Sequence, residues 1–108
     1  MENTFEDDFL NMVMLNQIEV VKLVVNSGMK DNCAVWIAAK EGNLAMVRFL
    51  VENGMKYNGA VYEAARNGNL DMVRFLVDNG MEHDDAVWIA ARNGHDDIAE
   101  YLRSKGMR

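Results

Sequence analysis

Hydrophobic residues recur along this chain with a fixed period of 26 residues. The segment AVWIAAKEGNLAMVRFLVENGM begins at Ala34, and closely similar segments begin at Ala60 and at Ala86. A more divergent copy, DFLNMVMLNQIEVVKLVVNSGM, begins at Asp8. A fixed period of this length indicates a stack of small repeated units, in which each unit buries its apolar side against the next one.

Within each unit the pattern predicts two helices joined by a tight turn. Val35, Ala38 and Ala39 recur at helical spacing on one side of a short first helix. Gly42 ends that helix, because glycine adopts the left-handed conformation that turns the chain without steric cost. A broad apolar stripe then marks the second helix, and its members are Leu44, Met46, Val47, Leu50 and Val51.

The expected fold is all-α, a solenoid of four helix–turn–helix units that makes up a single domain, residues 1–108. The expected units are residues 8–33, 34–59, 60–85 and 86–108. The first and last units are expected to act as caps, because a terminal unit has one face without a neighbour. Asp96 and Arg103 place charges where inner units carry leucine and valine, and Met12 and Val13 replace a pair of alanines. Caps at both ends predict a monomer.

Each unit resembles an ankyrin repeat. AVWIAAKEGNLAMVRFLVENGM follows that family's pattern of a T-P-L-H-x-A-A helix, a Gly-His turn, a V-x-x-L-L helix and a Gly-Ala ending, and the last copy carries Gly94 and His95. The resemblance extends from about Asp8 to Met107. It implies an array of stacked helix pairs that binds proteins and does not catalyse a reaction.

The units depart from the family pattern in length. The family repeat has about 33 residues, and the shortfall here lies between Gly54 and Ala60, where the family forms a projecting β-hairpin. We therefore expect the hairpins to be absent and the array to be purely helical. The family's histidine is replaced by an aromatic residue in three units, as Trp36, Tyr62 and Trp88.

Charge and composition exclude several classes of function. The net charge of −6 argues against direct binding of nucleic acid, which needs a basic face. The single cysteine, Cys33, cannot form an internal disulfide and predicts a reducing, cytoplasmic location. The chain lacks an apolar run of about 18 residues, so we expect no membrane insertion. His83 and His95 lack metal-site spacing, and no nucleophile motif is present, so we expect no metal, no cofactor and no enzymatic activity.

Candidate residues for contact with a protein partner lie on the first helix of each unit. Trp36, Tyr62 and Trp88 occupy the same position in three units, so stacking places them in one row. The row is open to two interpretations, packing between units and partner binding. Tryptophan, tyrosine and arginine are the residue types that contribute most to binding interfaces. The partner-binding candidates are Trp36, Ile37, Lys40, Tyr57, Tyr62, Glu63, Arg66, His83, Trp88, Ile89 and Arg92.

Two features of this candidate set are specific to the sequence. Ile37 and Ile89 flank Glu63 and are expected to make a small apolar patch with a charge in its middle. Tyr57 and His83 are expected in the short loops at the rim of the same face, without an evident role in packing.

The predicted function is non-catalytic binding of a protein partner through the inner face of the first helices and the short loops. The alternative is an acidic viral or phage inhibitor, or nucleic-acid mimic, that blocks a basic site on a host protein. Its acidic patch would consist of Glu82, Asp84, Asp85, Asp96 and Asp97. A third hypothesis, association into a larger assembly through incompletely capped ends, also stays open.

Overall fold

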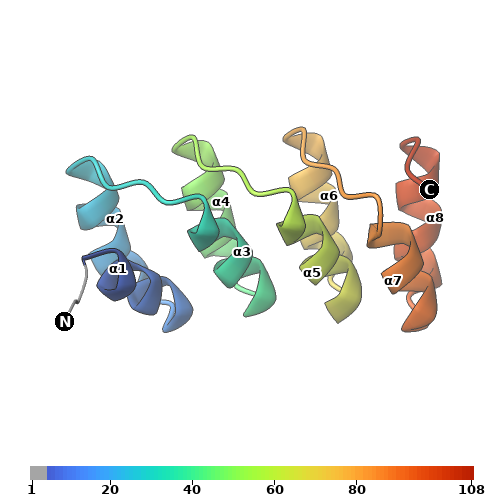
Figure 1. Cartoon of the computed structure of the whole chain (residues 1–108), viewed down its shortest axis with the longest axis horizontal. Coiled ribbons are helices and arrows are strands. Elements are labelled where there is room, and N and C mark those ends of the chain that lie inside the picture. The colour runs from blue at the N-terminus through green and yellow to red at the C-terminus, as the bar shows by residue number, and fades with distance from the viewer. Residues whose placement is uncertain (1–4) are drawn as a thin grey trace.

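The computed structural model describes residues 5–108, with side chains from Asp8 onward. These residues form eight helices and no strand, and the helices follow one another in four pairs (Figure 1). None of the eight is both long enough and apolar enough to cross a bilayer. The helices are α1 (Phe5–Met14), α2 (Ile18–Asn26), α3 (Cys33–Lys40), α4 (Leu44–Glu52), α5 (Gly59–Asn67), α6 (Leu70–Asp78), α7 (Ala86–Arg92) and α8 (Asp96–Ser104).

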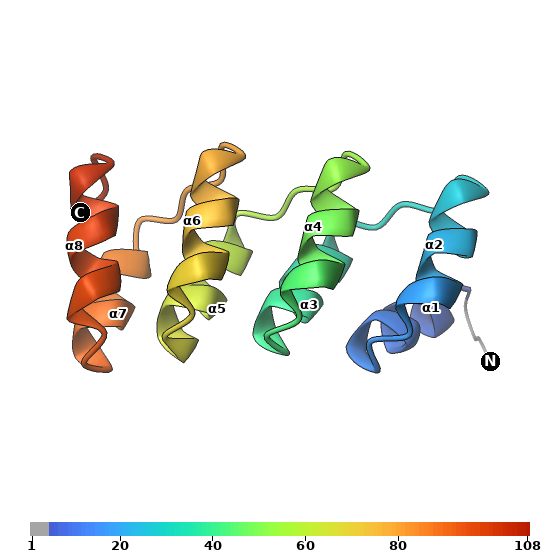
Figure 2. The ribbon, with the colours of Figure 1, turned by 180° about the vertical axis from the view of Figure 1, so that it is seen from behind.

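The helix pairs stack side by side in chain order, and the molecule measures 42 × 25 × 19 Å. The first helices, α1, α3, α5 and α7, form one layer, and the second helices, α2, α4, α6 and α8, form the other (Figures 1 and 2). Neighbouring first helices pack directly against each other along the whole stack. This arrangement confirms the predicted all-α solenoid of helix–turn–helix units.

The turn between the two helices of each pair depends on one residue with a left-handed backbone. Gly42, Gly68 and Gly94 adopt φ angles of 79°, 77° and 80°. Asn16 occupies the same place in the first unit with φ 57°, and asparagine is one of the few other residues that tolerate this region. The same turn therefore forms in all four units.

Methionine side chains close the end of the second helices. The Met55 amide donates to the Leu50 carbonyl at 3.1 Å, and the Met81 amide donates to the Leu76 carbonyl at 3.1 Å. Both methionine side chains are fully buried. This is the packing of an apolar residue after a helix-ending glycine, and burying each methionine contributes about 1.5–3 kcal/mol.

The linkers between units are tied to each other by asparagine side chains. The Lys56 amide donates to Oδ1 of Asn32 at 3.1 Å, and the Glu82 amide donates to Oδ1 of Asn58 at 3.3 Å. Each bond joins one linker to the next. These bonds connect the linkers without any β-hairpin, in agreement with the short spacing between units.

A row of cations crosses the layer of second helices, and each cation lies above an aromatic ring of the following unit. The distances to the ring centroids are 5.1–6.0 Å, and such contacts contribute about 0.5–1 kcal/mol at exposed sites. The pairs are Lys22–Phe49, Arg48–Phe75 and Arg74–Tyr101. Burial raises the pKa of the Tyr101 hydroxyl, and the Asp78 carboxylate raises it further, while the Arg74 guanidinium opposes both.

The two ends of the stack differ in polarity. Asp96, Glu100 and Arg103 are exposed on the last unit. Among the residues whose side chains the structure describes, the first unit exposes four large apolar side chains, where a cap is expected to present polar ones. They are Met14, Leu15, Val20 and Leu23.

Candidate protein-binding face

The aromatic row predicted from the sequence lies along the layer of first helices. Trp36 comes from α3, Tyr62 from α5 and Trp88 from α7. Trp36 and Tyr62 are partly buried, whereas Trp88 is 55% exposed. The difference arises because, within the described chain, no further unit packs beyond α7. The side chains of the row therefore pack between units and also contribute to the surface, and the exposed fraction is largest at Trp88.

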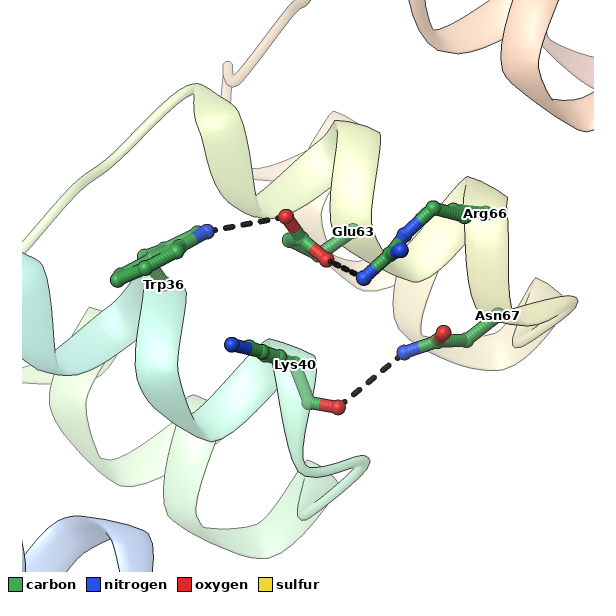
Figure 3. A network of polar contacts seen from close by, with 5 residues as sticks. All are labelled: Trp36, Lys40, Glu63, Arg66 and Asn67. Carbon is green, nitrogen blue, oxygen red and sulfur yellow. Dashed lines mark hydrogen bonds and ion pairs between the residues drawn. The ribbon is translucent and has the colours of Figure 1, made fainter.

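Glu63 connects two neighbouring first helices (Figure 3). Its Oε2 accepts a hydrogen bond from Nε1 of Trp36 at 3.2 Å, and its Oε1 pairs with Nη2 of Arg66 at 2.8 Å. Nearby, Nδ2 of Asn67 donates to the Lys40 carbonyl at 3.2 Å. Only 13% of the Glu63 side chain is exposed. The Glu63 carboxylate therefore lies at the contact between α3 and α5, where both of its oxygens are bound.

The predicted apolar patch around Glu63 is wrong. Ile89 is buried, and Ile37 is partly buried and packs against the core. The reason is that side chains at this position of the first helix point toward the neighbouring unit. Glu63 reaches the preceding unit through Trp36, so the equivalent isoleucines also point between units and fill the contact there.

The two linker residues have a packing role that the sequence did not reveal. The ring of Tyr57 stacks near Trp36, with centroids 6.3 Å apart and an interplanar angle of 25°. The imidazole of His83 lies 5.3 Å from the ring of Tyr62, and its Nδ1 accepts from the Asp85 amide at 3.2 Å. Each of these two linkers thus places a ring on the aromatic residue of the first helix in the same unit. Tyr57 stays exposed at the same time.

Cations accompany the exposed aromatic rings. Nζ of Lys40 lies 5.4 Å from the centroid of Trp36, and the guanidinium of Arg92 lies 5.3 Å from that of Trp88. Arg66 is paired with Glu63 instead and lies next to them in the row. All three cations are exposed. This face consequently offers aromatic surface together with positively charged hydrogen-bond donors, although the whole chain is acidic.

The acidic side chains of the alternative hypothesis do not form one cluster. Glu82, Asp84 and Asp85 lie in the linker before α7, whereas Asp96 and Asp97 lie in the first turn of α8. The seven residues of α7 separate the two groups by about 10 Å of helix. The acidic side chains therefore form two small groups, one at each end of α7, and not one patch.

Groups capable of metal or nucleophile chemistry are few. Within residues 8–108 no set of three or more His, Cys, Asp or Glu side chains is placed to hold a metal ion. Cys33 is exposed, but desolvation raises the pKa of its thiol, and the Asp31 carboxylate adds to that effect. A thiol with a raised pKa is a weak nucleophile at neutral pH, because little of it is thiolate.

A groove of about 400 Å³ lies on the opposite layer, between α4 and α6. Its wall alternates charges, Arg48 and Arg74 with Asp71 and Asp78, so it has no dominant sign. The arginines belong to the cation row, which the sequence analysis did not identify. The available signal was the recurrence of a cation and of a ring one residue beyond it, both at the period of the units. The cations are Lys22, Arg48 and Arg74, and the rings are Phe49, Phe75 and Tyr101.

Comparison with known proteins supports the interpretation of the repeat pattern. The family model described as ankyrin repeats, which spans three copies, matches residues 9–86 and residues 58–108. The two matches together extend over nearly the whole chain and confirm the resemblance noted in the sequence. The comparison with curated proteins gives no match.

Proposed function

Because the chain belongs to the ankyrin repeat family, whose repeats are generally non-catalytic protein–protein interaction modules, we propose that it binds a protein partner through its first helices and linkers. The observation that carries the proposal is the exposed indole of Trp88, held next to the guanidinium of Arg92. Lys40 lies over Trp36 in the same way. The exposed Cys33 suits a reducing compartment, and we place the binding event in the cytoplasm.

Some of the candidate residues pack between units and are therefore less available to a partner. Glu63, Ile37 and Ile89 hold neighbouring units together, so their substitution would weaken the fold as well as binding. Tyr62 and His83 pack on each other and support the surface from below. The accessible set that remains is Trp36, Lys40, Tyr57, Arg66, Trp88 and Arg92. We define these six residues as the first-helix face.

The energetic centre of this face is expected at its exposed indole. Tryptophan and arginine are enriched among the interface residues whose truncation to alanine costs about 2 kcal/mol or more. The indole of Trp88 has most of its surface still to bury, whereas Trp36 is already partly covered. We therefore expect the C-terminal half of the face to dominate the affinity.

The experiment compares three forms of the full chain as immobilised bait. The first is the unmodified chain, the second carries Trp88→Ala with Arg92→Ala, and the third carries Arg74→Ala on the opposite layer. Quantitative mass spectrometry identifies proteins that the first and third forms retain and the second loses. Titration calorimetry with such a partner should show a loss of about 30-fold or more in affinity for the double variant.

Two outcomes would contradict the proposal. One is equal retention of every specific partner by all three forms, with the double variant still folded by circular dichroism. The other is an affinity that falls steeply with salt and depends on Glu82, Asp84 and Asp85. That second result would support the acidic inhibitor, because exposed charges are screened by salt, whereas an interface centred on an aromatic ring changes little.

A further inference from the structure

The first unit exposes more large apolar side chains than any other unit of the described chain. Six large apolar side chains are exposed among the described residues, and four of them belong to this unit. The four are Met14, Leu15, Val20 and Leu23. Met14 stands at the position of Lys40, Arg66 and Arg92 on the first-helix face, so we call the other three, Leu15, Val20 and Leu23, the N-terminal end face. Soluble monomers seldom leave such a group of apolar side chains uncovered, so the end face marks a site of association.

Equivalent positions in the other units show which way Leu15 points. The residues at this position in the later units are Glu41, Asn67 and Asn93. Asn67 reaches the preceding unit, because its Nδ2 donates to the Lys40 carbonyl at 3.2 Å (Figure 3). Asn93 bonds instead to the Ile89 carbonyl of its own helix, so Asn67 alone shows this direction. By analogy with Asn67, Leu15 lies on the side of its unit that faces away from the next unit, and it is 63% exposed. An apolar residue stands there in place of a polar one.

Two more residues of the end face occupy positions that are covered in later units. Leu23 is equivalent to Phe49, whose ring lies beneath Lys22 of the preceding unit, and Leu23 itself is 71% exposed. Val20 is equivalent to Met46, which is fully buried, and yet Val20 is exposed. Within the described chain, the end face is thus a unit-to-unit contact surface without its second half.

The other end of the stack does not supply that second half. Inner units place a cation on the next ring, whereas the last unit has Glu100 at this position. Asp96 and Arg103 add further charges on the same unit. A head-to-tail contact between copies would bury these charges against Leu23 without partners, which costs several kcal/mol. Of the two end surfaces that another copy could offer, only its N-terminal end face is apolar like this one.

We propose that two copies of this chain associate through their N-terminal end faces. The contact is isologous, so it closes after two copies and does not grow into a filament. In this contact Leu15, Val20 and Leu23 of one copy cover the same three side chains of the other, and the first-helix face of each copy stays free. Each copy carries a net charge of −6, so moderate salt should strengthen the dimer by screening repulsion.

Sedimentation equilibrium of the full chain over a wide concentration series tests the proposal. The unmodified chain should approach twice its monomer mass of 12.2 kDa. The variant Leu15→Asn with Leu23→Lys should remain a monomer. Its dimer dissociation constant should be at least about 100-fold higher, because four exposed leucines are lost per dimer. Both positions are exposed, so circular dichroism should show an unchanged fold.

A control at the opposite end separates the two modes of contact. Glu100→Leu should leave the mass of the dimer unchanged, whereas a head-to-tail contact would strengthen and yield larger assemblies, because it would no longer bury this charge against Leu23. A chain with Leu15→Cys and Cys33→Ser should form a disulfide-linked dimer on oxidation. Ser104→Cys in the same Cys33→Ser background should not, because a disulfide needs α-carbons within about 7 Å.

Three results would overturn the proposal. They are a monomeric unmodified chain at the highest concentration, an unchanged dimer in the double leucine variant, and assemblies that keep growing with concentration. A monomer whose end face is instead shielded by another protein would also refute self-association. None of these results bears on partner binding, because the first-helix face is not part of this contact.

Discussion

Replacing Glu63 with alanine tests whether one carboxylate joins the two central units. In the folded chain this carboxylate accepts from Nε1 of Trp36 on α3 and pairs with Arg66 on its own helix. The variant removes both of these interactions at once. It leaves the Trp36 N–H without its protein acceptor in a place that is only partly open to water. We expect a clear loss of stability and no change of fold.

The magnitude follows from the exposure of each group. The Arg66 side chain is 45% exposed, so its ion pair contributes about 0.3 kcal/mol after screening. The hydrogen bond from Trp36 ends on a carboxylate that is mostly buried, and it contributes about 1–1.5 kcal/mol. The expected loss is therefore about 1.5 kcal/mol. A domain of this size would show a melting temperature about 6–12 °C lower.

Urea denaturation followed by tryptophan fluorescence and circular dichroism measures this loss. Glu63→Gln keeps an acceptor for Trp36 and should lose less than Glu63→Ala. Arg66→Ala removes only the exposed ion pair and should change the free energy of unfolding by about 0.5 kcal/mol or less. Equal losses for Glu63→Ala and Arg66→Ala would refute the reasoning, because the contact with Trp36 would then contribute nothing.

Three further predictions concern single side chains. Gly68→Ala should destabilise the chain more than Gly42→Ala in thermal unfolding, because both need positive φ, worth about 1–2 kcal/mol, but only the added carbon at Gly68 would lie 2.6 Å from the His95 ring. Tyr101→Phe should flatten the fall of stability in alkaline urea titrations. The folded chain holds the Tyr101 proton more tightly than the unfolded chain does, so this stability is complete below about pH 10 and is lost as pH rises. Cys33 should react with an aromatic disulfide more slowly in the folded chain than in denaturant at neutral pH, because its pKa is raised. Equal stabilities of the two glycine variants would contradict the first prediction. Parallel alkaline titrations of Tyr101→Phe and the unmodified chain would contradict the second, and equal reaction rates of Cys33 in the folded and unfolded chain would contradict the third.

The features that the sequence predicted well are local or periodic. The left-handed residues at Gly42, Gly68 and Gly94 follow from turn chemistry that involves a few neighbouring residues. The helix pairs and their order follow from the repeated apolar stripe, because each copy must bury the same face. The absence of hairpins among the described residues follows from the short spacing between Gly54 and Ala60.

The features that it missed depend on how far apart neighbouring units lie. Helical spacing gives the angle of Glu63 and Ile89 around their helices, but it does not say whether that side meets water or the next unit. The stacking distance brought Trp36 within hydrogen-bonding reach of Glu63 and buried Ile89. The contact of His83 with Tyr62 was missed for the same reason, because the path of a linker is set by both units that it joins.

The end units show a related limit. Charges at Asp96 and Arg103 marked the last unit as polar because they replace apolar residues of the inner copies. The exposed state of Val20 and Leu23 could not be recognised in this way, since both positions are apolar in every copy. Only the stacking direction shows that these two side chains lack the cover that their equivalents have.

The asparagine bonds between linkers make the array modular. The linker between α4 and α5 contributes both parts of such a bond, the side-chain acceptor Asn58 and the main-chain donor Lys56, and the neighbouring linkers supply the partners Glu82 and Asn32. A tandem duplication of residues 34–59 would therefore bring both halves of the joint with it. An array built in this way can change its length by whole copies, and its evolution by recombination needs no compensating substitutions at the seams.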